Sequence, residues 1–301
     1  MALDFDRQFE PSYGQAVPVT EGVMRITAEN PSAFTFHGTN TYIVGTETLA
    51  VIDPGPEIEG HLDTILRTID GRPVSHIFVS HTHADHSPLA AALQRETGAP
   101  VLAEGPHRPA RPLRIGEVNP LDASADMAFK PDIVLANGEK VAGDGWALTA
   151  IHTPGHTANH LAFALEGTGI LFSADHVMAW ATSIVAPPDG SMADYMTSLD
   201  TLLSRDDTVF LPGHGGPLKK PAAFMRGLKA HRKMRERAVL ERLRLGDRTI
   251  TEMVAAIYRD TDPRLHGAAG LSVLAHLEDL VGRGTATVED EISIDGIFFP
   301  V

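Results

Sequence analysis

Short apolar runs separated by polar turns fill the beginning of the chain. Val23–Thr27, Thr41–Val44 and Leu49–Ile52 are rich in β-branched residues, and polar segments that contain glycine separate them. This pattern predicts an antiparallel meander of three strands. In His61–Ile69 the apolar positions recur at helical spacing, which predicts a short helix. The next apolar run, Val74–Val79, predicts a buried strand.

The middle of the chain alternates strands and helices. Ser87 is a good helix N-cap and Pro88 suits the first helical position, so a helix is predicted from about Pro88 to Glu96. Residues 104–131 carry five prolines and scattered charge, and we expect a long irregular excursion there. A helix is predicted over Ala193–Leu203. Further strands are predicted at Ile133–Leu135, Glu139–Val141, Ala147–Ile151, His160–Leu165, Gly169–Phe172 and Thr208–Leu211.

The end of the chain has a different order of elements. A long amphipathic helix is predicted because four apolar residues share one helical face: Met225, Leu228, Val239 and Leu243. Thr249 and Glu252 form a capping-box pattern that opens a second helix, and a third ends at Gly282. Ala286–Ile294 and Ile297–Phe299 then predict a hairpin. Three helices and a hairpin are the order of a winged helix.

Composition limits the protein class. The 301 residues are 43% hydrophobic, enough for one large domain and a small one, and we predict domains at 1–220 and 221–301. No apolar run approaches the roughly 18 residues of a membrane span. Residues 1–6 also lack the order of a secretory signal. We therefore expect a cytoplasmic location and no membrane partner. With no cysteine, any metal must be held by histidine and carboxylate groups.

The formal net charge of -14 is uneven along the chain. Residues 221–301 contain 12 basic and 12 acidic residues, whereas the preceding residues contain 13 basic and 27 acidic ones. A strongly acidic first domain repels polyphosphate, although bound divalent metals would reverse the sign locally. Nucleic acid is disfavoured as a bulk partner.

The segment Ser80–His86 is unusually rich in groups that bind metals. It follows a predicted strand, and four of its seven residues are candidate ligands: His81, His83, Asp85 and His86. Two histidines two positions apart on an extended loop point to one side and can share a metal, whereas Asp85 and His86 turn toward a neighbouring position. One short loop can therefore serve two metal sites.

Three later strand ends supply matching residues. His156 would complete a three-histidine site with His81 and His83, and His214 would complete a second site with Asp85 and His86. Asp175 has two carboxylate oxygens and would bridge the two. We predict two divalent ions per chain, with zinc as the expected metal and iron or manganese as alternatives. Such a pair, roughly 3.5–4 Å apart, can share a hydroxide that attacks a polarised substrate.

These motifs resemble those of the metallo-β-lactamase superfamily. The resemblance covers roughly residues 20–220 and rests on His81-x-His83-x-Asp85-His86, Thr153–Thr157, Asp175 and Pro212–Gly215. It implies an α/β fold, a four-layer αββα sandwich with two metals at one edge, followed here by a small winged-helix-like α+β domain. Gly38–Tyr42, Pro187–Ser191 and Tyr195 further resemble a subgroup called β-lactamase-like protein 2. Some members of that subgroup cut single-stranded RNA, and they carry the same appendage.

Two classes of function follow. In the first, a metal-bridging hydroxide attacks an ester, thioester or phosphodiester, and Asp85 orients it or accepts its proton. Small-molecule hydrolysis and cleavage of single-stranded RNA compete within this class. Antibiotic hydrolysis is disfavoured, because the chain has neither an export signal nor the cysteine that some β-lactamases place where Asp175 stands. No evident basic cluster would hold a glutathione tail, but thioester or ester hydrolysis stays open.

The second class is a non-catalytic protein that binds a partner through the winged helix. The complete ligand set argues against it. The predicted third helix shows no basic recognition face, so duplex DNA is disfavoured, and packing or shaping of the active site is the favoured role of this domain. A homo-oligomer is compatible with the sequence.

Several other residues are candidates for supporting roles. Contact with substrate or with metal ligands is expected of Asp53, His160, His176, Asn40 and Tyr195. We assign no function to His61 or His107. His231, Arg232 and Arg235 could contact an anionic substrate near the site. Substrate choice is expected to depend on residues 104–131, on residues 178–189 and on the tail.

Overall fold

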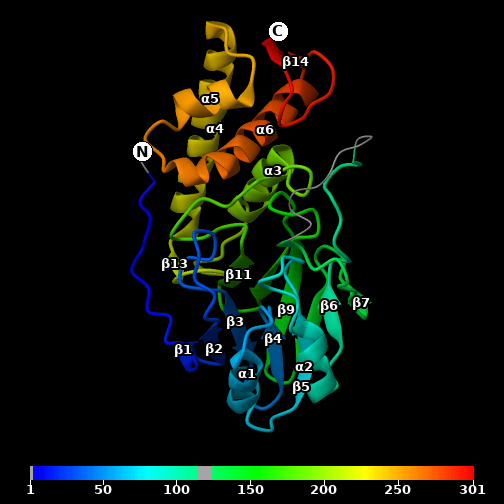
Figure 1. Cartoon of the computed structure of the whole chain (residues 1–301). Helices are drawn as coiled ribbons and strands as arrows, with labels where there is room; N and C mark the ends of the chain where they lie inside the picture. The colour runs from blue at the N-terminus through cyan, green and yellow to red at the C-terminus, as the bar shows by residue number, and fades with distance from the viewer. Residues whose placement is uncertain (1–2, 114–123) are drawn as a thin grey trace.

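The computed structural model describes residues 3–113 and 124–301. One sheet is built mainly from the first part of the chain (Figure 1). Its strands are, in spatial order, β1 (Ala16–Thr20), β2 (Val23–Thr27), β3 (Asn40–Val44), β4 (Leu49–Ile52), β5 (Val74–Phe78), β6 (Val101–Ala103) and β7 (Ile133–Val134). The strands β2, β3 and β4 pair antiparallel, as the predicted meander of three strands requires, and β1, which the sequence did not predict, adds antiparallel to β2. The strands β4 to β7 pair parallel.

The second sheet faces the first. Its spatial order is β13 (Leu218–Lys219), β12 (Val209–Pro212), β11 (Ile170–Ala174), β10 (Leu161–Leu165), β9 (Trp146–His152) and β8 (Lys140–Gly143). Only β11 and β12 are parallel, because the helix α3 (Met192–Leu203) connects them. Aromatic rings fill the space between the sheets, where Phe78 of β5 meets Phe163 of β10 at a centroid distance of 5.2 Å.

Helices cover the outer face of each sheet. The helices α1 (His61–Ile69) and α2 (Ala90–Thr97) share a buried apolar cluster with the first sheet, for example through Ile65 and Leu93. The second sheet buries its outer face against α3 and the start of α4 (Pro221–Leu245), through Leu199 and Leu228. Three apolar layers thus separate four structural layers. The predicted αββα sandwich is confirmed.

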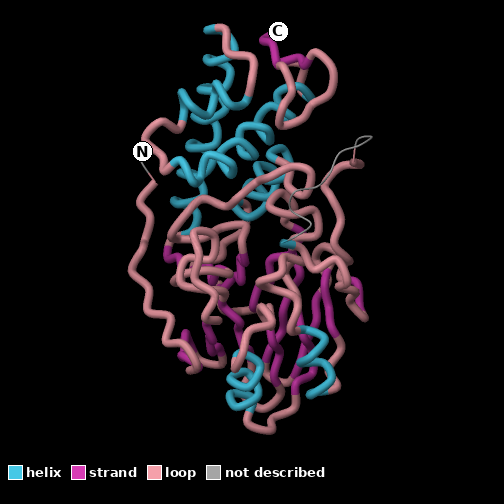
Figure 2. The backbone as a smooth tube through the Cα atoms, in the orientation of Figure 1, coloured by secondary structure: helices cyan, strands magenta, loops and turns pink. Residues whose placement is uncertain are grey.

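The last part of the chain forms a separate apolar cluster. It contains α5 (Ile250–Ile257), a 3₁₀ turn (Pro263–Leu265), α6 (His266–Gly282) and the antiparallel pair β14 (Ala286–Val288) and β15 (Phe298–Pro300). Figure 2 shows these helices at one end of the molecule, away from α1 and α2. The capping box of Thr249 and Glu252 is present at the start of α5, as predicted.

Helix α4 belongs to both parts. Its first half packs Met225 and Leu228 into the cluster that covers the second sheet, and its second half packs Val239 and Leu243 into the C-terminal cluster. The domain boundary between residues 220 and 221 stays a prediction, and α4 is continuous beyond it. In the described part of the chain, no helix is both long and apolar enough to span a membrane.

Two predicted boundaries are wrong. Helix α2 begins at Ala90 and not at Pro88, because the Ser87 hydroxyl donates to Asp126 Oδ2 (3.0 Å) and does not cap the helix. The first strand of the hairpin ends at Val288, where the acidic run Glu289–Glu291 begins, a composition that disfavours a strand. Part of the predicted excursion over 104–131 lies outside the described residues.

Candidate metal centre

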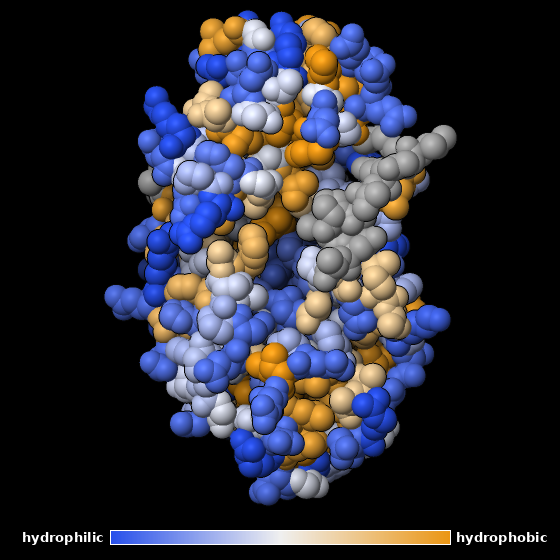
Figure 3. Space-filling model, viewed as in Figure 1, coloured by the Kyte–Doolittle hydropathy of each residue, from blue (hydrophilic) through white to orange (hydrophobic). Residues whose placement is uncertain are grey.

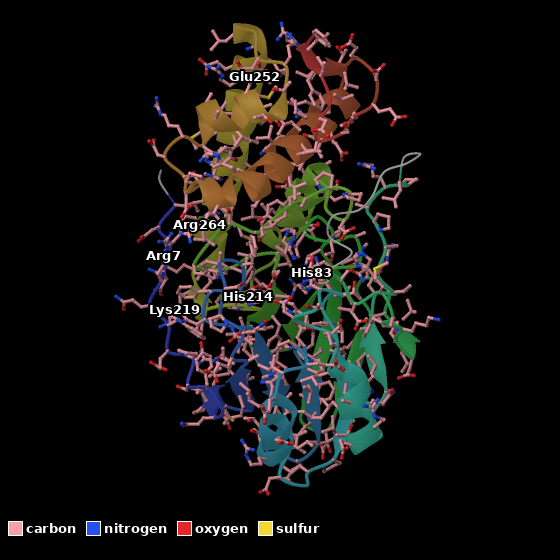
Figure 4. The ribbon with its side chains drawn as sticks, in the orientation of Figure 1. Arg7, His83, His214, Lys219, Glu252 and Arg264 are labelled. Atoms are coloured by element: carbon pink, nitrogen blue, oxygen red, sulfur yellow. The ribbon has the colours of Figure 1, made fainter. Side chains whose placement is uncertain are left out.

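The predicted ligand residues converge at one edge of the two sheets. Residues 80–86 follow β5, His156 lies after β9, Asp175 follows β11 and His214 follows β12. Three groups have ligand atoms that all lie within 4.8 Å of one another: His81, His83 and His156; His81, His86 and Asp175; and Asp85, His86 and His214. Figure 3 shows a hollow with a hydrophilic floor near the middle of one face, and Figure 4 places His83 and His214 in this central region.

Three histidine nitrogens of the first group point at one another. His83 Nδ1 lies 3.1 Å from His81 Nε2 and 3.0 Å from His156 Nε2. The other nitrogen of His156 donates to the carbonyl oxygen of Ile184 (2.7 Å). This bond places the proton on Nδ1 and leaves the Nε2 lone pair directed at the cluster, the state that binds a metal.

Asp175 lies between the two sets of histidines. Its Oδ2 is 3.2 Å from His214 Nε2 and 3.7 Å from His156 Nε2, and its Oδ1 is 3.5 Å from His86 Nε2. Asp85 Oδ2 lies 3.3 Å from His214 Nε2 and 3.5 Å from His86 Nε2. The carboxylate of Asp175 therefore faces both sets, whereas that of Asp85 faces one.

Asp53 supports the cluster from behind. Its Oδ2 accepts from His86 Nδ1 (2.9 Å) and from the Ser80 hydroxyl (2.7 Å), and its Oδ1 accepts from the Ser80 backbone N–H (2.7 Å). Both oxygens are thus occupied by protein donors. Asp53 orients His86 and the loop after β5, and it does not point into the cluster.

The segment before β3 provides further support that was only partly foreseen. The Thr39 hydroxyl donates to Asp85 Oδ2 (3.1 Å), and the Gly38 carbonyl oxygen lies 3.2 Å from His214 Nδ1. The Asn40 amide donates to the carbonyl oxygens of Pro212 (3.1 Å) and Gly215 (2.9 Å), which fixes the loop of His214. The sequence singled out Asn40 as a candidate, whereas Thr39 was noted only as part of the Gly38–Tyr42 resemblance and was given no role.

Two glycines allow the close packing. A Cβ atom on Gly213 would lie 2.4 Å from Asp175 Oδ1 and 2.7 Å from His86 Cε1. Gly155 has a φ of +134°, and a Cβ there would lie 2.3 Å from Tyr195 Cα. The backbone before His156 and the backbone before His214 can therefore approach the cluster only because neither residue has a side chain.

Three candidate residues lie behind the cluster. His160 is fully buried, and its Nδ1 lies 2.8 Å from the Thr153 hydroxyl. The His176 ring packs against the Tyr195 ring in a tilted arrangement at a centroid distance of 4.6 Å, and the Tyr195 hydroxyl donates to the His176 carbonyl oxygen (3.1 Å). The ring of Tyr195 is completely buried. These contacts favour a supporting role over contact with substrate.

His107 and His61, to which the sequence assigned no function, are also hydrogen-bonded in the interior. His107 Nδ1 lies 3.0 Å from the hydroxyl of Thr82, the residue between the first two histidines of the motif, and its Nε2 lies 3.4 Å from Asp189 Oδ2. His61 Nε2 lies 3.0 Å from the Thr41 hydroxyl. His107 therefore connects the ligand-rich segment Ser80–His86 to the segment before α3. The sequence pattern could not reveal this contact.

The electrostatics divide the cluster into two sets. Burial, with neighbouring histidines, lowers the pKa of His81 and brings that of His83 to about 3. Burial alone would also lower the pKa of His86 and His214, but Asp85 and Asp175 outweigh it and raise the pKa of His214 to about 9. Burial raises the pKa of those carboxyls, but the attraction of His86 and His214 holds both below the usual range.

The buried carboxylates and histidine nitrogens that face one another fit divalent cations. His86 Nε2 and Asp175 Oδ1 are buried and, among the described residues, have no hydrogen-bond partner. Buried polar atoms are nearly always satisfied, and a cation held between these two atoms, which face each other at 3.5 Å, would satisfy both. The donors are histidine nitrogens and carboxylate oxygens without thiolate, a set that suits zinc, iron or manganese. The residues thus form a site for a divalent metal.

Comparison with known families decides the assignment. Residues 34–214, which include every predicted ligand, match the model of the metallo-beta-lactamase superfamily. The chain belongs to the metallo-β-lactamase superfamily. Residues 249–294 match the beta-lactamase associated winged helix domain, so the predicted winged helix is confirmed. The chain is a hydrolase of the metallo-β-lactamase fold with a C-terminal winged-helix domain.

Individual relatives span most of the chain. The "Beta-lactamase-like protein 2 homolog" of Drosophila melanogaster is 29% identical over 90% of this chain and 91% of its own length. An atrochrysone carboxyl ACP thioesterase of Paecilomyces divaricatus is 30% identical over 80% of this chain and 73% of its own length. The crystal structure of a beta-lactamase domain protein from Burkholderia ambifaria superposes with a TM-score of 0.80 at 22% identity, covering 97% of this chain and 95% of that one.

Proposed function

We propose that this metallo-β-lactamase-fold enzyme uses two divalent ions to hydrolyse an ester or thioester. His81, His83 and His156 would hold one ion, and Asp85, His86 and His214 would hold the other. The observation that carries this proposal is the position of Asp175, whose Oδ2 lies 3.7 Å from His156 Nε2 and 3.2 Å from His214 Nε2. A carboxylate in this position can bridge two ions, as in two-metal hydrolases.

The ligands leave one side of the centre open. His81, His86, His156, Asp175 and His214 are buried, whereas His83 and Asp85 are partly exposed. Substrate therefore reaches the centre past His83 and Asp85. Bound divalent ions would supply Lewis acidity toward a substrate oxygen and lower the pKa of a water molecule.

Asp85 is placed to handle the proton. Its side chain is 25% exposed, on the open side, and the Thr39 hydroxyl fixes its Oδ2 at 3.1 Å. A carboxylate held in this way can orient an attacking water and accept its proton while the scissile bond breaks. Asp85 is accordingly the residue to which we assign both a ligand role and a catalytic role.

The ester or thioester class has support from relatives and from charge. A relative at 30% identity is named as an ACP thioesterase, and thioesters are activated carbonyl compounds that such a centre can polarise. The net charge of -14 opposes the approach of long polyanions. Both observations favour a carbonyl substrate over a nucleic acid. A cytoplasmic location stays a prediction.

Cleavage of single-stranded RNA is the second candidate, and one feature favours it. Helix α4 exposes basic residues along one face: Arg226, Lys233, Arg237 and Arg244. None of them forms an ion pair with a carboxylate in residues 3–113 or 124–301. A basic stripe along a helix is a common electrostatic feature of nucleic-acid binding.

A substrate screen separates the two candidates. Zn²⁺-loaded protein would be assayed in parallel on an acyl thioester, a phosphodiester and single-stranded RNA, with Asp85→Ala as the test variant. Asp63→Ala, which removes an exposed carboxylate of α1, is the control. We expect thioester turnover that Asp85→Ala reduces at least about 100-fold and that Asp63→Ala leaves unchanged. Turnover of RNA alone would favour the second candidate, and equal rates for Asp85→Ala and wild type would contradict the mechanism.

A further inference from the structure

Arg232 on α4 is buried in an unusual way. Its side chain is only 4% exposed, and among the described residues it forms no ion pair with a carboxylate. Its Nε also has no hydrogen-bond partner there. Removing a guanidinium from water is costly unless other interactions compensate. Such a residue is expected to have a specific role, and its contacts indicate what that role is.

The contacts of Arg232 converge on the segment that follows β11. Its Nη2 donates to the carbonyl oxygen of Ser183, and its guanidinium lies 5.1 Å from the ring centroid of Tyr195. The Ser183 hydroxyl donates to the His176 carbonyl oxygen (2.7 Å), and the Tyr195 hydroxyl donates to the same oxygen (3.1 Å). Arg232, Tyr195 and Ser183 therefore hold together the two ends of residues 176–183, which begin beside Asp175.

The next carbonyl along the chain belongs to the metal centre. Ile184 O accepts the 2.7 Å hydrogen bond from His156 Nδ1, whose Nε2 points at His83 and Asp175. Ser183 O and Ile184 O are adjacent along the backbone. Of these two consecutive carbonyl groups, that of Ser183 thus accepts from α4 and that of Ile184 accepts from a proposed ligand.

We infer that Arg232 is a positioning residue of the metal centre, acting on His156 through the consecutive carbonyl groups of Ser183 and Ile184. The inference rests on the proposed metal site. By fixing the Ser183 carbonyl, Arg232 fixes the direction of the Ile184 carbonyl, which in turn sets the tautomer and the angle of the His156 ring. Because Arg232 lies on α4, the helix that continues into the C-terminal cluster, the C-terminal part of the chain helps to build the metal centre.

Two measurements together test this inference: the affinity of the protein for Zn²⁺ and the protection of backbone amides against hydrogen exchange. Arg232→Met keeps the unbranched stem of the side chain and removes the guanidinium with its hydrogen bonds and charge, whereas Arg226→Met removes an exposed arginine from the same helix and serves as the matched control. Zn²⁺ affinity would be measured by competition with a chromogenic chelator, and amide hydrogen exchange would be followed over residues 176–186.

In Arg232→Met we expect one Zn²⁺ to bind about 3- to 10-fold more weakly, because losing a direct partner of a ligand usually weakens affinity 10- to 100-fold and Arg232 acts one peptide further away. Exchange in residues 176–186 should accelerate, and Arg226→Met should match wild type in both measurements. Arg232→Lys retains a donor that can reach Ser183 O, so it should recover part of the affinity. This rescue would not follow from a general packing defect.

The outcomes separate the inference from the function on which it rests. If wild type binds Zn²⁺ and folded Arg232→Met binds it with the same affinity, the inference is overturned and the metal site stands. If wild type binds no Zn²⁺, both are overturned. Should Arg232→Met fail to fold, the comparison of Arg232→Lys with wild type decides, because unchanged Zn²⁺ affinity and unchanged exchange in that variant would refute the positioning role.

Discussion

Replacing Asp53 by Asn tests how strictly the support behind the centre controls its ligands. Three donors point at the Asp53 carboxylate: the Ser80 N–H at 2.7 Å, the Ser80 hydroxyl at 2.7 Å and His86 Nδ1 at 2.9 Å. An amide has one acceptor oxygen and one NH₂ group. If that oxygen serves the Ser80 N–H, the NH₂ group faces His86 Nδ1. Because the NH₂ group donates to His86 Nδ1, that nitrogen must accept, and the imidazole carries its proton on Nε2. This is the nitrogen to which the metal should bind.

The expected loss can be estimated from these bonds. A hydrogen bond between a charged group and a buried partner contributes about 1.5–3 kcal/mol. At about 1.4 kcal/mol per decade, this corresponds to roughly a 10- to 100-fold loss of affinity, the usual range for a residue that orients a ligand. The loss should fall on the ion held by Asp85, His86 and His214. The ion held by His81, His83 and His156 should be affected less, because Asp53 reaches these rings only indirectly, through the Ser80 hydroxyl that lies 3.0 Å from His81 Nδ1.

Competition titration with Zn²⁺ measures this difference. Wild type should show two tightly bound ions per chain, and Asp53→Asn should show one tight and one weakened ion at neutral pH. Asp63→Asn on the exposed face of α1 is the control and should retain two. Two ions with wild-type affinity in a folded Asp53→Asn variant would refute the idea that Asp53 orients His86.

Other predictions concern packing, protonation and metal removal. Gly213→Ala should lower hydrolysis at least about 100-fold, since its Cβ would lie 2.4 Å from Asp175 Oδ1, whereas Gly216→Ala, with no atom nearer than 3.6 Å, should be neutral in the same assay. Burial lowers the pKa of His61 to about 4, below the 6.5 of an unfolded chain. Its contribution to stability is therefore complete above pH 6.5 and is lost by at most about 1.4 kcal/mol per unit as the pH falls toward 4. In urea unfolding, the stability of wild type should fall more steeply than that of His61→Gln as the pH decreases from 6.5 to 4, and parallel slopes would contradict it. A chelator should lower the unfolding temperature of metal-loaded protein, because metal binds the folded state, and an unchanged temperature would argue against a bound ion.

The ligand set was the part of the site most visible in the sequence. Four ligand residues in Ser80–His86, together with His156, Asp175 and His214 at later strand ends, converge in the structure as their spacing predicted. Strand ends can be recognised locally, and the ends of neighbouring strands meet at one edge of a sheet. Whether these residues bind metal in the predicted groups stays a prediction.

The supporting contacts could not be foreseen in the same way. Thr39 reaches Asp85 across 46 positions of sequence, and Arg232 reaches Ser183 across 49. Such bonds depend on the packing of whole elements, and neither residue type is unusual in its local pattern. The wrong start of α2 has the same origin, because the preferred cap residue Ser87 forms a tertiary bond to Asp126 instead.

Anomalous scattering from crystals of Zn²⁺-loaded protein, recorded at the zinc absorption edge, tests the central claim most directly. The two-metal assignment predicts two peaks roughly 3.5–4 Å apart, one among His81, His83 and His156 and the other among Asp85, His86 and His214, with the Asp175 carboxylate between them. A single peak at full zinc loading, or peaks outside these residues, would contradict it.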